Sequence, residues 1–183
     1  MDVGFAAHVG RDRATWWVGP AALVLAMATF VHLGHDANAA AWAAVQVVLV
    51  WLAGCDIESR RLPNAVTLPV AALAVCFRAV FERTALLEIL VAGTAVFAVF
   101  LAASALMRGG LGMGDVKLAG MLGFLLGKTV VPALVLGVFA AGVWAVALLA
   151  SGRAGLRSSI AYGPFLALAG AAAILFSNPP ALV

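Results

Sequence analysis

Two aspartates at the edges of apolar segments are the residues of this chain best suited to chemistry. Asp56 ends an apolar run, and Asp115 follows a segment with four glycines between positions 109 and 114. A charged side chain at membrane depth costs about 2.5–3.5 kcal/mol on insertion scales, so an acid there indicates function. Two carboxylates that meet in a partly desolvated site share a proton. Such a pair can activate water and polarise a carbonyl, which is the chemistry of amide hydrolysis.

The glycines before Asp115 suit the same reaction. Because glycine has no side chain, we predict that the glycines around Asp115, Gly112 and Gly114 among them, allow positive φ and the close approach of another backbone, here an extended substrate segment. A helical substrate has no free backbone groups and must be unwound locally. The residues do not indicate which aspartate carries the shared proton, so the two are assigned as a pair.

Composition places these acids in a membrane protein. Hydrophobic residues make up 65% of the 183 positions and charged residues 10%, and the mean hydropathy is +1.12. Several apolar runs reach roughly 17–22 residues, the length of a helix that crosses a bilayer. We predict an all-α, polytopic membrane helix bundle with about six to seven transmembrane helices. The net charge of +3 lies in short loops, and nothing indicates nucleic-acid binding.

The apolar runs predict individual helices and one embedded peptidase domain over residues 1–183. Its core is expected at 39–183, after an extra N-terminal segment, 1–38, with one span. Pro63 should end the second helix, and Asn64 should be the N-cap of the third. The predicted helices cover about 17–33, 39–55, 65–80, 86–107, 116–127, 130–150 and 160–176.

A cleavable leader is the alternative for the first run, because a basic start, an apolar region and Ala37-Asn38-Ala39 resemble one. That apolar region exceeds the usual length of about 7–15 residues, and the next run follows almost at once. We therefore expect a retained span.

Alternate crossing supplies a topology without any motif. With the N-terminus in the cytoplasm, Asp56 and Asp115 both reach the cytoplasmic ends of their helices, although they lie 59 positions apart. Eight basic residues then fall on the cytoplasmic side and three on the other, in agreement with the positive-inside rule. The eight are Arg11, Arg13, Arg60, Arg61, Arg108, Lys117, Arg153 and Arg157, and the three are Arg78, Arg83 and Lys128.

The remaining reactive side chains have simpler interpretations. Cys55 and Cys76 have no CxxC partner, and His32, His35 and Asp36 fit a solvated helix end better than a metal site. We expect no metal and no cofactor. Taken singly, each aspartate could be a helix-end residue. Glu58 and the Arg60-Arg61 pair fit topology and solubility, Glu88 has no assigned role, and the small residues Ala119, Gly123 and Gly127 predict a helix-packing face.

Three motifs together resemble the type IV prepilin peptidases, membrane aspartic peptidases of the GxGD class. The first runs from Asp56 through Arg60-Arg61-Leu62-Pro63-Asn64, and the second is Gly112-Met113-Gly114-Asp115-Val116-Lys117-Leu118. The third is Tyr162-Gly163-Pro164-Phe165-Leu166-Ala167. A bare GxGD is a weak signal, but three motifs in this order, over about residues 50–177, are specific.

The resemblance implies a leader peptidase of the bacterial inner membrane, with Asp56 and Asp115 catalytic at the cytoplasmic side. Its substrates would be prepilins or pseudopilins, cut after the glycine that ends a short basic leader. The chain lacks the tetracysteine domain of larger members, so it resembles the small branch that serves tight-adherence (Flp) pili, and we do not expect N-methylation. Residues implied for substrate binding or support are Gly112, Gly114, Lys117, Pro63, Asn64, Gly163 and Pro164.

Two other functions compete with this one. A GxGD protease of the presenilin or signal-peptide-peptidase type usually has a Tyr-Asp pair, whereas Cys55 precedes Asp56 here. A non-catalytic transporter or assembly subunit could use the acids to move protons or cations. Acids at one membrane face, rather than staggered through its depth, argue against a relay.

Overall fold

The computed structural model describes residues 16–81, 83–106, 111–152 and 162–176. Every regular element in these ranges is helical, which confirms the all-α prediction. The helices are α1 (Val18–Leu33), α2 (Ala37–Ser59), α3 (Asn64–Phe81), α4 (Arg83–Leu106), α5 (Met113–Leu126), the 3₁₀ turn η2 (Gly127–Thr129), α6 (Val130–Ala150) and α7 (Gly163–Phe176).

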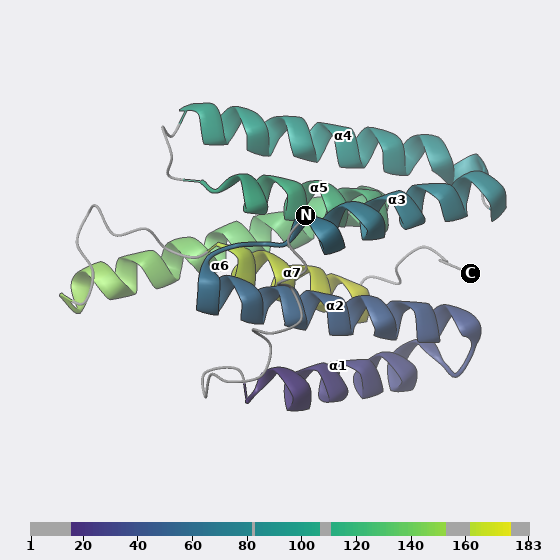
Figure 1. Cartoon of the computed structure of the whole chain (residues 1–183), viewed down its shortest axis with the longest axis horizontal. Coiled ribbons are helices and arrows are strands. Elements are labelled where there is room, and N and C mark those ends of the chain that lie inside the picture. Colours follow the sequence, from purple (N-terminus) through teal and green to yellow (C-terminus); the bar gives the residue numbers. More distant parts are fainter. Residues whose placement is uncertain (1–15, 82, 107–110, 153–161, 177–183) are drawn as a thin grey trace, which may run out of the picture.

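The helices form a bundle in which consecutive members run in opposite directions along the long axis (Figure 1). By length and composition, three described stretches could cross a membrane: 37–59, 86–106 and 113–150. The last stretch reverses direction at η2 and so forms two helices, α5 and α6 (Figure 1). Helices α5 and α7 have 14 residues each, about 21 Å, which is shorter than the hydrocarbon core.

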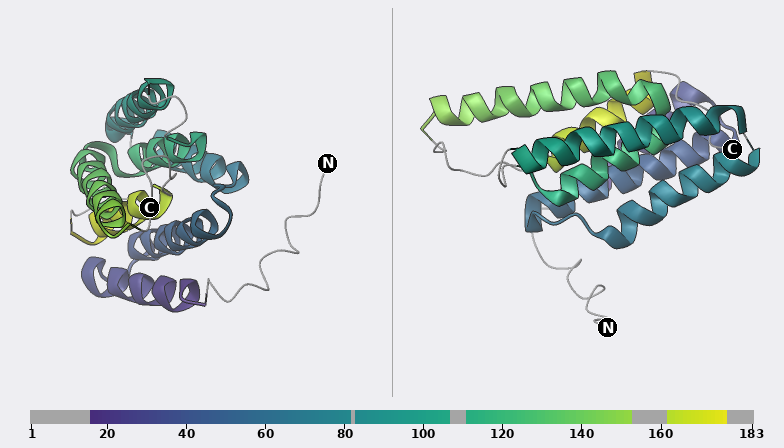
Figure 2. Two further views of the ribbon diagram at one scale, coloured as in Figure 1. Left: turned by 90° about the vertical axis from the view of Figure 1, so that its left-hand side faces the viewer. Right: turned by 90° about the horizontal axis from the view of Figure 1, so that it is seen from above.

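Two groups of helices share the core. Helix α2 packs on α1 and α7, and α6 also packs on α7. Helix α5 packs on α3 and α4, and its contact with α7 joins the groups. In the end view of Figure 2, α1 and α4 lie on opposite sides of the bundle, with the other helices between them. The buried Gln46 of α2 donates to the carbonyl of Ala171 in α7 over 3.1 Å, which fixes α2 on α7.

Helix α5 is the most enclosed helix because small residues bring it against α4. Gly123 faces the backbone of α4: a Cβ there would lie 2.7 Å from Cα of Gly93 and 3.0 Å from the carbonyl oxygen of Ala92. At Gly127, which follows α5, a Cβ would lie 2.8 Å from Oε1 of Glu88, also a residue of α4. The predicted packing face is thus confirmed at these two positions. Ala119, the third member, is fully buried.

We expect Gly123→Ala to lower the free energy of unfolding by about 1–3 kcal/mol, because the added methyl group must push two helix backbones apart. Gly142→Ala is the matched control, since a Cβ at this helical glycine meets nothing within 4 Å and alanine is the better helix former. Thermal unfolding in detergent measures both variants. Equal melting temperatures would contradict the close approach of α4 and α5.

The helix ends around α2 and α3 differ in part from the predictions. Asp36 lies at a helix end, as predicted, and caps α2 by accepting a hydrogen bond from the N–H of Ala39 at 2.8 Å. Helix α2 ends before Pro63, at Arg60, whose φ of 51° is left-handed and whose N–H donates to the carbonyl of Asp56. The prediction that Asn64 is the N-cap of α3 is wrong. The carbonyl of Pro63 accepts the first helical bond, from Thr67 at 3.2 Å, which puts Pro63 in that position.

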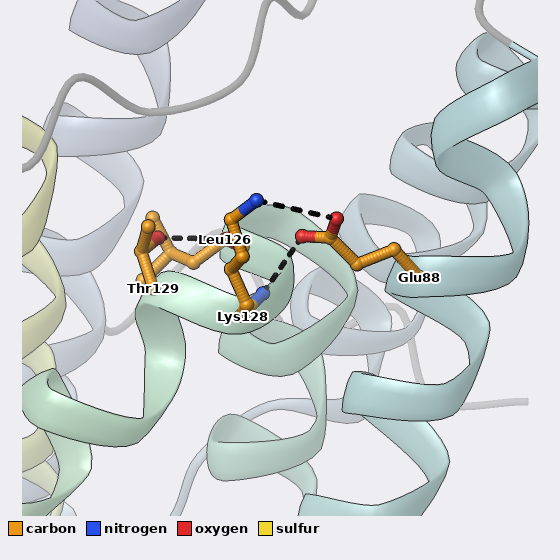
Figure 3. Close-up of polar contacts among 4 residues, drawn as sticks. All are labelled: Glu88, Leu126, Lys128 and Thr129. Carbon is orange, nitrogen blue, oxygen red and sulfur yellow. Dashed lines mark hydrogen bonds and ion pairs between the residues drawn. The ribbon is translucent and has the colours of Figure 1, made fainter.

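At the opposite end of the bundle from Asp56, Glu88 fastens α4 to η2 (Figure 3). Its Oε1 accepts from the backbone N–H of Lys128 at 3.1 Å, and its Oε2 lies 3.7 Å from Nζ of the same lysine. Gly127, just before that lysine, has a φ of +58°, a conformation that glycine adopts at little cost. One carboxylate therefore holds the turn in two ways.

We expect Glu88→Ala to lower the melting temperature more than Lys128→Met does. The alanine removes the ion pair and also a surface hydrogen bond from a backbone N–H, which adds about 0.5–1 kcal/mol to the loss. The methionine removes only an ion pair whose lysine side chain is 80% exposed, and such pairs contribute little. Thermal unfolding of the two variants in one detergent is the measurement. A larger loss for Lys128→Met would show that the ion pair, and not the backbone bond, holds the turn.

Candidate functional site

The two aspartates lie at the same end of the bundle and are both buried. Asp56 is in the last turn of α2, Asp115 is in the first turn of α5, and these ends point the same way (Figure 1). Their exposed fractions are 6% and 8%. The carboxyl groups are close enough for the charge of Asp56 to act on Asp115. Among the described residues, no hydrogen bond joins the two carboxyl groups, and Oδ2 of Asp56 has no partner.

Asp56 faces the start of α7. A Cβ on Gly163 would lie 2.6 Å from Oδ2 of Asp56 and 2.8 Å from its Cγ, so only glycine fits beside this carboxylate without a shift. The backbone of Gly163 therefore lies directly against this carboxyl group. Arg60, one turn further along the chain, is near enough for its charge to act on Asp56. The first and third sequence motifs therefore meet here.

Gly112 and Gly114 surround Asp115 in different ways. Gly112 is the N-cap of α5 with φ −71° and ψ 145°, and its carbonyl accepts from the N–H of Asp115 at 3.1 Å. Gly114 lies within the helix, against Leu62. Neither has a positive φ, so the conformational freedom predicted for these glycines is not used at these two positions. The extended backbone of Gly112 before the helix is open to any residue. Gly114 is tightly packed on a side chain, since a Cβ there would lie 3.1 Å from Cβ of Leu62. The close approach of a substrate backbone stays a prediction.

Lys117 and Asn64 bring the second motif against the first. Nζ of Lys117 donates to Oδ1 of Asn64 at 2.9 Å, across 53 positions of sequence. Leu62, two residues before Asn64, is 9% exposed and packs on Gly114. The segment between α2 and α3 thus lies across the first two turns of α5.

The other predicted residues have less direct positions. Pro63 acts through its carbonyl as the cap of α3, and Pro164 is the second residue of α7, partly exposed. Arg60 and Arg61 are exposed at the end that holds the acids, while Arg78 is fully buried rather than in a loop. Several residues of the sequence predictions lie outside the described ranges: Arg11, Arg13, Arg108, Gly109, Gly110, Arg153 and Arg157.

A groove of about 450 Å³ lies elsewhere, beside the start of α4. Leu87, Val91 and Ala92 form its apolar wall, with Glu88 and Lys128 among its polar residues. Because these residues belong to the opposite end of the bundle, the groove is not part of the carboxylate site.

Two residues near the carboxylates have no role predicted from the sequence. Leu62 belongs to the first motif, but the motif does not predict that its side chain packs on Gly114, next to Asp115. The hydroxyl of Ser104, near the end of α4, donates to the carbonyl of Leu111 at 2.9 Å. This bond ties α4 to the residue that lies two positions before the start of α5. A lone hydroxyl in the last two turns of an apolar helix is the signal that could have identified Ser104.

Comparison with known proteins agrees with these motifs. Prepilin leader peptidase/N-methyltransferases from two strains of Burkholderia pseudomallei, 1026b and K96243, are each 32% identical over 163 residues, or 85% of this chain and 52% of theirs. The chain thus spans about half the length of these curated relatives. No solved structure matches the chain. The model of the type IV leader peptidase family matches residues 43–149, which is more than half of the chain, and the protein therefore belongs to that family.

Proposed function

We propose that this protein is a membrane aspartic endopeptidase that removes the short basic leader from type IV or Flp-type prepilins or pseudopilins. The observation that carries the proposal is the burial of two aspartates, from helices far apart in sequence, at one end of the bundle. Membership of the type IV leader peptidase family supports the substrate class. The names of the curated relatives support the same reaction.

In the proposed mechanism, Asp56 and Asp115 share one proton. The ionised carboxylate takes a proton from water, whose oxygen attacks the scissile carbonyl, while the protonated carboxyl donates a hydrogen bond to that carbonyl. Collapse of the tetrahedral intermediate breaks the C–N bond. The amine leaves with a proton from the dyad, which returns to its singly protonated state. Water exclusion around two side chains that are over nine-tenths buried strengthens these interactions.

The orientation that we propose places the acids at the cytoplasmic side of the bacterial inner membrane. The exposed Arg60 and Arg61 lie at the end that holds the acids, as the positive-inside rule requires of a cytoplasmic face. In this arrangement residues 39–183 form the peptidase core. The helix α1, which packs on α2, belongs to the additional N-terminal segment.

Co-expression with a small Flp-type prepilin tests the proposal. We expect mass spectrometry of the recovered pilin to show loss of the leader, with the new N-terminus directly after the leader's last glycine. A substrate in which this glycine is replaced by leucine is the control and should remain whole. An intact wild-type pilin in the presence of accumulated protein would refute the proposed activity.

A further inference from the structure

The segment that joins α2 to α3 contacts α5 on both sides of Asp115. Leu62 packs on Gly114, immediately before that aspartate, and Asn64 accepts a hydrogen bond from Lys117, two residues after it. One contact is apolar and buried, and the other is polar and directional. Together they fix both the distance and the rotation of the segment relative to the first turns of α5.

These contacts matter because the two carboxylates belong to different groups of helices. Asp56 is on α2, which packs on α1 and α7, while Asp115 is on α5, which packs on α3, α4 and α7. Neither group alone fixes the spacing of the carboxyl groups. Only six positions separate Asp56 from Leu62, the residue of this segment that packs on α5.

We propose that Asn64 and Lys117 form a positioning contact that sets the spacing of Asp56 and Asp115, an inference that rests on the proposed peptidase function. The lysine acts on the placement of the dyad through Asn64 and does not bind the substrate. A displacement of about 1 Å in a reacting group can cost a hundredfold in rate. An exposed hydrogen bond, in contrast, adds little to global stability, so its loss should slow the reaction without unfolding the protein.

The kinetic test compares Lys117→Met, Asn64→Leu, the double variant and the exchange Asn64→Lys with Lys117→Asn, in detergent with a purified prepilin. We expect each single variant to lower kcat by about tenfold with little change in KM. The double variant should be no slower than either single variant, because both remove one contact. The exchange restores an N–H donor opposite an amide oxygen and should recover most of kcat, and Lys117→Arg should remain active.

Three kinetic outcomes would overturn the proposal: a wild-type kcat in Lys117→Met, losses that add in the double variant, or a raised KM with unchanged kcat. The last outcome would make Lys117 a substrate contact instead. Failure of the wild-type protein to cleave any prepilin counts against the proposed function and not against the positioning contact.

A distance measurement tests the contact without activity. Spin labels at Ile57 and Met113, which are 48% and 50% exposed, report on the ends of α2 and α5 in a background with Cys55→Ser and Cys76→Ser. We expect a narrow distance distribution in the parent protein, a broader one in Lys117→Met and a narrow one again in the exchange variant. Identical distributions in all three would refute the positioning role.

Discussion

Replacement of either aspartate by asparagine is expected to abolish leader removal while the protein still accumulates in the membrane. Asp56→Asn and Asp115→Asn keep the size of the side chain but replace one of the two carboxyl groups by an amide, which can neither take a proton from water nor share one. General acid–base catalysis by one such group contributes about 10²–10⁴-fold, so cleavage should fall below detection in a co-expression assay. The ratio of whole to shortened pilin on an immunoblot measures the effect.

Asp36→Asn is the matched control for these variants. It lies at the other end of α2, where it caps the helix through its Oδ1, and asparagine caps as well as aspartate. Its leader removal should equal that of the parent protein. Normal processing by either Asp56→Asn or Asp115→Asn would disprove the dyad. Loss of processing in Asp36→Asn would show that the assay responds to any change in charge.

The second large effect is expected at Gly163, where a methyl group should raise helix propensity and lower activity at once. Alanine forms helices better than glycine, yet its Cβ would lie 2.6 Å from Oδ2 of Asp56. The carboxylate must move, and we expect kcat to fall by about a hundredfold. Steady-state cleavage and thermal unfolding, measured on one preparation, separate the two effects.

Gly19→Ala provides the comparison for this variant. Gly19 is the second residue of α1, and a Cβ there meets nothing within 4 Å. It should therefore cleave the substrate at the parent rate. A Gly163→Ala protein with unchanged kcat would show that Asp56 is not held against α7 during the reaction.

Much of the fold can be predicted because the membrane demands long apolar helices with polar interruptions. The helix predicted at about 130–150 has these bounds in the structure, and the bounds of the other helices differ from the predictions by a few residues. The end of α2 could not be predicted, because it depends on the left-handed conformation of Arg60, which is rare outside glycine. The sequence also predicts Asn64 as the cap of α3, but the side chain of Asn64 reaches α5.

The site divides in a similar way. Alternate crossing places Asp56 and Asp115 at one end of the bundle without knowledge of any contact. The positions of Leu62 and Gly163 relative to the acids depend on the path of a short connection and on the packing of α7, which local patterns do not encode. The glycines before Asp115 indicate freedom for unusual backbone angles. In the structure, Gly112 is extended, and the missing side chain of Gly114 makes room for Leu62.

The packing of α2 on α7 has a consequence for biosynthesis. Of the described helices, α7 leaves the ribosome last, and more than 100 residues separate Asp56 from Gly163. Until α7 inserts, Asp56 lacks the glycine against which its carboxylate rests, and α5 lacks the helix that joins it to the α2 group. Contacts between such distant segments form late in assembly. A nascent chain that already carries both aspartates is therefore still without the complete carboxylate site until the last helix inserts.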